Sequence, residues 1–187
     1  MDITTSFLNG NHNINVEPLT EELFKKEKEQ IKSFDCGRNL LNQFIKDKRK
    51  CIEHLKMHIA KTYLVYDGDI IVGYYCLSAD AMRATDIIRS QFKSWKTYST
   101  YPAVKIGRFA INQKVAKVGY GSSTMDYIKI QIALANMPIS VRFLTVDAVN
   151  DEGTLYFYEK NNFIYLSKND KNDETRLMYY DLNAVFN

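Results

Sequence analysis

The sequence predicts one domain of mixed α/β class over residues 1–187, with a largely antiparallel sheet and helices on both of its faces. The chain of 187 residues, 45% of them hydrophobic, is long enough for one core. Apolar residues recur at helical spacing up to about residue 55, and strand-like apolar runs alternate with shorter helical segments after it. These runs predict about six to seven strands.

The amino-terminal third is predicted to be mostly helical. Residues 1–18 show no clear period, and we expect an extended lead-in there. From Thr20 to about Lys32, Glu and Lys surround apolar residues spaced for one face, which predicts an amphipathic helix. A second helix with a basic outer face is predicted to begin close to Arg38.

A hairpin follows the helices. Two apolar runs, residues 61–66 and 70–79, flank the turn sequence Asp67-Gly68-Asp69. Gly73 lies inside the second run and indicates a bulge or a close approach of another backbone.

The second half alternates strands and helices. A strand over residues 103–112 runs into a glycine-containing loop and an apolar-periodic helix. A near-continuous apolar strand then precedes a short helix that ends at Asn161-Asn162. A final strand pair, residues 163–168 and 175–182, closes the chain.

Several classes of protein are disfavoured by composition. The three cysteines, Cys36, Cys51 and Cys76, are odd in number and contain no CxxC pair, so neither a disulfide framework nor a zinc knuckle is predicted. His54 and His58 lie four residues apart but lack the Glu of a metalloprotease helix, so no metal site is expected. Without a signal-like start or an apolar stretch of about 18 residues, we expect a soluble cytoplasmic protein away from membranes.

Charge is distributed unevenly. The net charge is only +3, yet residues 81–120 carry eight Lys or Arg against one acid. Residues 145–181 carry eight acids against four bases. This asymmetry permits an anionic ligand on one side of the protein without requiring one.

The junction of strand, loop and helix near residue 120 is the most informative part of the chain. A loop at a helix start presents backbone N–H groups to a phosphate, and Gly119 and Gly121 remove side chains that would block access. Lys114 and Lys117 add positive charge. The P-loop pattern is absent and the dinucleotide fingerprint lacks its third glycine, which disfavours nucleotide hydrolysis and nicotinamide binding.

Four segments together resemble the GNAT acyltransferase superfamily in order and spacing: Tyr101-Pro102, IGRFAIN, KVGYGSS and LYFYEKNNF. The resemblance spans roughly residues 34–182. Within the superfamily, the sequence is most similar to the acetyltransferase toxins of bacterial type II toxin-antitoxin pairs, which acetylate the amine of aminoacyl-tRNA. It implies a GNAT-like sheet and acetyl-CoA as co-substrate.

The resemblance also implies a set of site residues. The strand backbone of Phe109, Ala110 and Ile111 would bind the pantetheine arm, and Asn150 would bind the pantetheine or the following helix. Tyr158 would protonate the departing thiolate, because a phenol of ordinary pKa about 10 is a competent acid for that group. The pyrophosphate would be held by a loop that comprises Lys117, Val118, Gly119, Tyr120, Gly121 and Ser122. Ala116 departs from the family pattern, which has Gln or Arg there.

The acceptor amine is left open. A basic surface suited to tRNA phosphates is one reading, and a small-molecule or protein amine is the alternative. A binding module that has lost turnover is the third. The toxin-like reading implies a small antitoxin partner and, by resemblance, a homodimer. The bases considered for tRNA are Lys46, Lys48, Arg49, Lys50, Arg83, Arg89, Lys93, Lys96 and Arg108.

Overall fold

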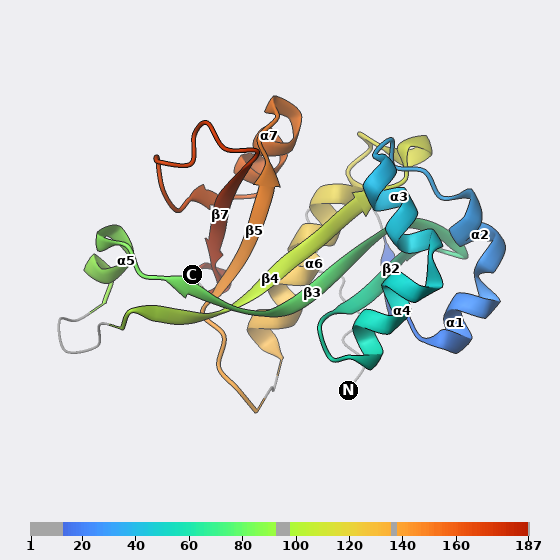
Figure 1. Ribbon diagram of the computed structural model, residues 1–187, viewed down its shortest axis with the longest axis horizontal. Helices are drawn as coiled ribbons and strands as arrows, with labels where there is room; N and C mark the ends of the chain where they lie inside the picture. Colours follow the sequence, from blue (N-terminus) through green and yellow to red (C-terminus); the bar gives the residue numbers. More distant parts are fainter. Residues whose placement is uncertain (1–12, 93–97, 136–137, 187) are drawn as a thin grey trace. The chain divides into compact units, whose positions relative to one another are not determined.

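The computed structural model describes residues 13–92, 98–135 and 138–186 (Figure 1). These residues group into two compact units. Unit 1 takes residues up to 78 and residues 107–128, and unit 2 takes residues 79–106 and those from 129 onward. Two long strands contribute residues to both units, and the single domain over residues 1–187 remains a prediction.

The secondary structure follows the predicted mixed order, with one additional strand at the start. The helices are α1 (Glu21–Lys26), α2 (Lys28–Ser33), α3 (Asn39–Lys46), α4 (Lys48–Lys56), α5 (Asp86–Ser90), α6 (Tyr120–Leu134) and α7 (Glu152–Lys160), with 3-10 turns η2 (Gln113–Val115) and η3 (Leu182–Val185). The strands are β1 (Ile14–Pro18), β2 (Lys61–Asp67), β3 (Ile70–Arg83), β4 (Thr100–Ile111), β5 (Phe143–Val149), β6 (Ile164–Tyr165) and β7 (Thr175–Asp181).

The strands form one seven-stranded sheet in the order β1-β2-β3-β4-β5-β7-β6. β4 and β5 pair in parallel, whereas β1–β2, β2–β3, β5–β7 and β6–β7 pair antiparallel. The predicted mixed, largely antiparallel sheet is therefore confirmed, as is the number of strands.

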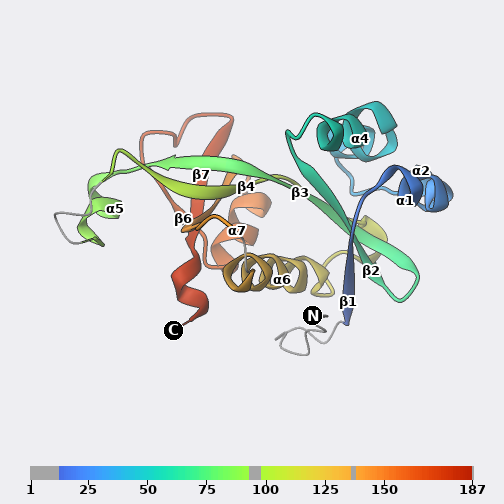
Figure 2. The ribbon, with the colours of Figure 1, turned by 90° about the horizontal axis from the view of Figure 1, so that it is seen from below.

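Unit 1 carries helices on both faces of its part of the sheet (Figure 2). Helices α1 to α4 cover one face, where Phe34 and Phe44 pack on Tyr74 with ring centroids 5.6 and 6.1 Å apart. The first two turns of α6 lie on the opposite face. Side chains along β3 alternate between the two faces of the sheet. Tyr75, the residue after Tyr74, therefore points to the opposite face and stacks on Tyr63 with ring centroids 5.0 Å apart.

Both predicted amino-terminal helices are interrupted. The first divides into α1 and α2 at Glu27, and the second divides into α3 and α4 at Asp47. Asp47 is extended, with a ψ of 103°, and its carboxylate accepts the N–H of Arg49 at 3.0 Å. A side chain that caps the next helix competes with continuation of the helix before it. The apolar periodicity of the sequence therefore continues although the helix is interrupted.

The lead-in and the hairpin are ordered where described. Residues 14–18 form β1 and pair with β2, while residues 1–12 of the predicted lead-in lie outside the described part. The β2–β3 register shifts beside Gly73, which confirms the predicted bulge.

Unit 2 is organised around β5 and β7, which pair over seven residues. Its apolar core includes Ile88, Tyr101, Phe143 and Tyr179. Helix α7 ends as predicted, with Asn161 as C-cap and Asn162 at a φ of 62°. The predicted strand over residues 163–168 is limited to the two residues of β6. Among the described residues, no helix is long and apolar enough to cross a membrane.

Candidate functional site

The predicted phosphate loop is open in unit 1. It connects η2 to the start of α6, and residues 116–119 are all exposed. Lys117 and Gly119 have positive φ values of 67° and 109°, which turn the chain sharply into the helix. Gly119 then accepts the N–H of Ser123 at 3.0 Å as the helix begins. The loop therefore exposes the start of a 15-residue helix, where N–H groups of the first turn point outward.

Tyr120 is the one aromatic residue of this loop, and its ring faces inward. Its side chain is buried, and its hydroxyl donates a hydrogen bond to the carboxylate of Asp67 at the end of β2. This bond raises the pKa of Tyr120, because it is made by the protonated phenol. Tyr120 therefore contributes its backbone to the loop, while its side chain ties the loop to the hairpin turn.

The strand end before the loop is packed very closely on β3. A Cβ at Gly73 would lie 2.7 Å from the carbonyl oxygen of Ala110, so only glycine fits there. One residue beyond the strand, Asn112 donates its N–H to Val72 at 2.8 Å. The close approach predicted from Gly73 is thus confirmed at the strand proposed to bind pantetheine.

The parallel pairing of β4 with β5 is short. It covers three residue pairs, from Ala103–Phe143 to Lys105–Thr145. Phe109, Ala110 and Ile111 lie beyond this ladder, so β5 does not pair with them. A strand can bind a ligand through its backbone only where its N–H and C=O groups are not already paired with a neighbouring strand.

Ala116, the departure from the family pattern, is exposed. The nearby amide of Gln113 does not replace the missing side chain, because it donates to Asp35 at 2.7 Å. Lys114 on η2 and Lys117 in the loop are both exposed, and they are the basic side chains proposed to meet an anion there.

The other two predicted site residues, Tyr158 and Asn150, belong to unit 2. Tyr158 is buried on α7, and its ring packs edge-on against Phe157 and Phe163 at centroid distances of 5.2 and 5.4 Å. Asn150 donates its side-chain amide to the carbonyls of Lys171 and Asp173 at 3.0 and 2.8 Å. Its amide hydrogens therefore hold the loop before β7.

Asp151, rather than Asn150, caps α7. The Asp151 carboxylate accepts the N–H and the hydroxyl of Thr154, each at 2.9 Å. This hydrogen bonding fixes the start of the helix that carries Tyr158.

The cysteines are poorly placed for nucleophilic chemistry. Cys51 and Cys76 are buried, and desolvation raises their thiol pKa values to about 12 and about 11. Cys36 is partly exposed, and desolvation raises its pKa as well. A thiolate is the reactive form, so all three lack the activation that a cysteine nucleophile needs.

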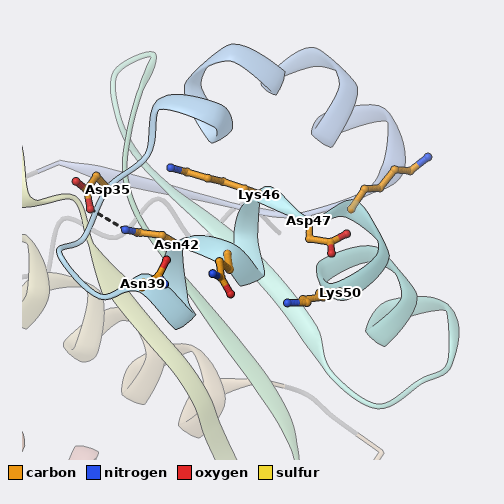
Figure 3. A pocket seen from close by; sticks show the side chains of 8 residues that line it. Asp35, Asn39, Asn42, Lys46, Asp47 and Lys50 are labelled. Atoms are coloured by element: carbon orange, nitrogen blue, oxygen red, sulfur yellow. Dashed lines mark hydrogen bonds between the residues drawn. The ribbon is translucent and has the colours of Figure 1, made fainter.

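The predicted basic surface is partly neutralised in unit 1. Lys48 pairs with Glu21, Arg49 pairs with Asp47 at 3.2 Å, and Arg108 lies 3.9 Å above the Phe44 ring. A hollow of about 600 Å³ nevertheless opens along α3 and the start of α4 (Figure 3). It is lined by Asp35, Asn39, Asn42, Gln43, Lys46, Asp47, Lys48 and Lys50.

The remaining predicted bases are divided. Arg83 and Arg89 are exposed in unit 2, and Lys93 and Lys96 lie outside the described residues. Within the described ranges, no group of three or more His, Cys, Asp or Glu side chains is arranged to hold a metal ion.

Comparison with solved structures assigns the fold to a class. It is the fold of the GNAT acetyltransferase toxins of type II toxin-antitoxin systems. No family model matches the chain, and no curated protein matches it by sequence.

Individual structures of KacT and AtaT carry this likeness. A Tyr-to-Phe variant of KacT is 22% identical, with a TM-score of 0.72 over 92% of this chain and 97% of that one. AtaT complexed with acetyl-methionyl-tRNAfMet is 20% identical, with a TM-score of 0.72 over 92% and 97% of the two chains. AtaTR bound with acetyl-CoA is 20% identical, with a TM-score of 0.69 over 93% and 98%.

Proposed function

We propose that this protein is an acetyl-CoA-dependent N-acetyltransferase that moves an acetyl group to a primary amine. The observation that carries the proposal is the open glycine loop at the start of α6, which follows η2 and the β4 segment beyond the β5 ladder. The AtaTR structure bound with acetyl-CoA has this fold, which supports the same co-substrate here.

In the proposed reaction, loop amides with Lys114 and Lys117 bind the coenzyme pyrophosphate. Backbone N–H groups of residues 109–111 orient the pantetheine, and one of them donates to the oxyanion, a contact worth about 3 to 4 kcal/mol in comparable sites. Alignment of amine and thioester contributes roughly 7 to 11 kcal/mol in favourable cases, so a protein nucleophile is unnecessary. We propose Tyr158 as the acid for the thiolate.

The cofactor proposal is tested by titration calorimetry with acetyl-CoA. Lys117→Glu places an acid at the proposed pyrophosphate and should weaken binding by about tenfold or more at low salt. Lys61→Glu is the matched control, because Lys61 is also exposed in unit 1 but lies away from the loop, at the start of β2. Equal affinities of the two variants would contradict the proposed phosphate site.

We propose the amine of aminoacyl-tRNA as the acceptor. Support comes from the structure of AtaT complexed with acetyl-methionyl-tRNAfMet and from the exposed Lys46 and Lys50 of this chain. Incubation with acetyl-CoA and charged tRNA should give acetylated aminoacyl-tRNA by mass spectrometry. Unchanged tRNA beside rapid acetylation of a polyamine or a peptide would instead establish the small-molecule or protein reading.

Ala116 favours one further candidate, a module that binds acyl-CoA without turnover. A free-thiol release assay separates the two, since a binding module gives calorimetric binding and no thiol across many amines. The proposed enzyme would act in the cytoplasm. A small antitoxin is a proposed partner, as in AtaT bound to the C-terminus of the antitoxin AtaR, and a homodimer is proposed from the resemblance.

A further inference from the structure

The outer face of α7 has an unusual composition. Glu152, Tyr156 and Glu159 recur at three- and four-residue spacing, so they share one face of the helix. Tyr158 is buried, whereas the Tyr156 side chain is 64% exposed. A large aromatic ring is thus held in solvent between two carboxylates.

This face forms one wall of a hollow within unit 2. The hollow has a volume of about 580 Å³, enough for one or two long side chains, and Tyr165 of β6 contributes another wall. Its lining residues are Glu152, Gly153, Leu155, Tyr156, Glu159 and Tyr165.

With the residues that the structure describes, the two carboxylates of the hollow form no ion pair. In the part of the chain that the structure describes, neither Glu152 nor Glu159 has a basic side chain within 4.0 Å. Burial, together with the neighbouring Glu159 carboxylate, raises the pKa of Tyr165, the other tyrosine of the hollow. Carboxylates beside an exposed aromatic ring form a site whose complement is a cation with an extended or planar shape.

The protein itself supplies an example of such a cation beside the hollow. The guanidinium carbon of Arg176 lies 3.8 Å above the Tyr165 ring, and its Nε donates to Asp170 at 3.2 Å. A tyrosine face and a carboxylate thus already bind one guanidinium at the edge of this surface. Tyr156 and Glu152 repeat the same pair of groups on α7, with the ring exposed.

We propose that the α7 hollow binds an arginine side chain presented by a basic segment of a partner protein. The local charge favours a polypeptide over a nucleic acid, because Glu152 and Glu159, which line the hollow, would repel phosphates. Guanidinium is favoured over ammonium because it stacks on tyrosine while it bonds a carboxylate.

This binding has a consequence for α7. A partner on the outer face would contact the same helix whose inner face carries Tyr158. The binding proposal itself does not rest on the proposed enzyme activity, since it uses none of the loop or strand residues.

The experiment uses the full chain and a synthetic twelve-residue peptide of alternating Arg and Gly, with the Lys–Gly peptide and spermine as comparisons. Binding is followed by NMR of labelled protein and by calorimetry at low salt. The Arg peptide should shift the amide signals of α7 and β6 and bind about threefold or more tightly than the Lys peptide. The Glu152→Gln/Glu159→Gln variant should lose about tenfold or more in affinity.

The matched control is Asp173→Asn/Glu174→Gln, which removes the same charge from an exposed loop outside the hollow. It should retain wild-type affinity for the Arg peptide. The proposal is overturned if the control weakens binding equally, if spermine binds as tightly as the Arg peptide, or if no α7 signal moves. Tyr156→Ala keeps every charge and should still weaken binding, whereas unchanged affinity would exclude the stacking contribution. Acetyl-CoA affinity, measured in parallel, reports separately on the proposed function.

Discussion

Gly73→Ala is the sharpest test of how β3 positions the strand proposed to bind pantetheine. The added Cβ would lie 2.7 Å from the Ala110 carbonyl oxygen, about 0.7 Å short of the 3.4 Å at which ordinary contact begins. The obstruction is backbone, so β4 must move or the contact must stay strained. Overpacking of this kind costs about 1 to 3 kcal/mol.

One term opposes this cost. Alanine lowers the entropy of the unfolded chain and so favours folding by about 0.4 to 1 kcal/mol. The free energy of unfolding should therefore fall by about 1 to 2 kcal/mol, or roughly 2 to 8 °C in Tm for a chain of this size. Displacement of Ala110 should also weaken acetyl-CoA binding by about tenfold, because positioning errors of this order are costly at reacting geometry.

Gly107→Ala is the control on the neighbouring strand. No heavy atom lies within 4 Å of a Cβ placed at Gly107, so this variant should keep the wild-type Tm or exceed it. Thermal unfolding and calorimetry with acetyl-CoA measure both effects. If Gly73→Ala unfolds at the same temperature as Gly107→Ala and binds acetyl-CoA equally well, close packing at Ala110 does not position this strand.

Tyr120→Phe should raise KM for acetyl-CoA by about fivefold with a smaller change in kcat, because it frees the phosphate loop from Asp67; a kcat loss at constant KM would exclude this role. Tyr158→Phe should keep acetyl-CoA binding and lower turnover by roughly 10²- to 10⁴-fold in a thiol-release assay, and unaltered turnover would leave Tyr158 a packing residue. The hydrogen bond from Lys48 and the proximity of Lys56 hold the pKa of Glu21 at about 2, well below its ordinary 4.5. The ion pair therefore stabilises the fold above pH 4.5 and is lost as the pH falls toward 2, so the stability difference between wild type and Glu21→Gln should shrink over that range in urea unfolding. Calorimetry should show one cooperative transition if residues 1–187 form the predicted single domain, and two separable transitions would contradict it.

The sequence predicted correctly those structural features that depend on a few neighbouring residues. Gly73 indicated a bulge because glycine within an apolar strand has few other uses, and the structure shows both the bulge and the close backbone. The end of α7 at Asn161 and Asn162 followed from the same kind of reasoning. The interruption at Asp47 was missed because the apolar period continues through it. Helix α3 ends there because the Asp47 carboxylate accepts the backbone N–H of Arg49 and so caps the start of α4.

The candidate site was predicted less completely than the fold. The loop and its strand could be located because glycines and lysines cluster there in sequence. The bond from Tyr120 to Asp67 could not, since it joins residues far apart along the chain. The sequence nevertheless contained a signal, because Tyr120 lies between two glycines at a helix start. Its large apolar ring has no local partner there and must pack against another part of the protein.

β1 is a short strand with practical consequences. Ile14 to Pro18 cover the outer side of β2, which would otherwise present its unpaired backbone groups to other molecules. Glu17 and Pro18, at the end of this border strand, discourage further pairing. Truncated variants that begin after residue 18 should therefore self-associate during expression.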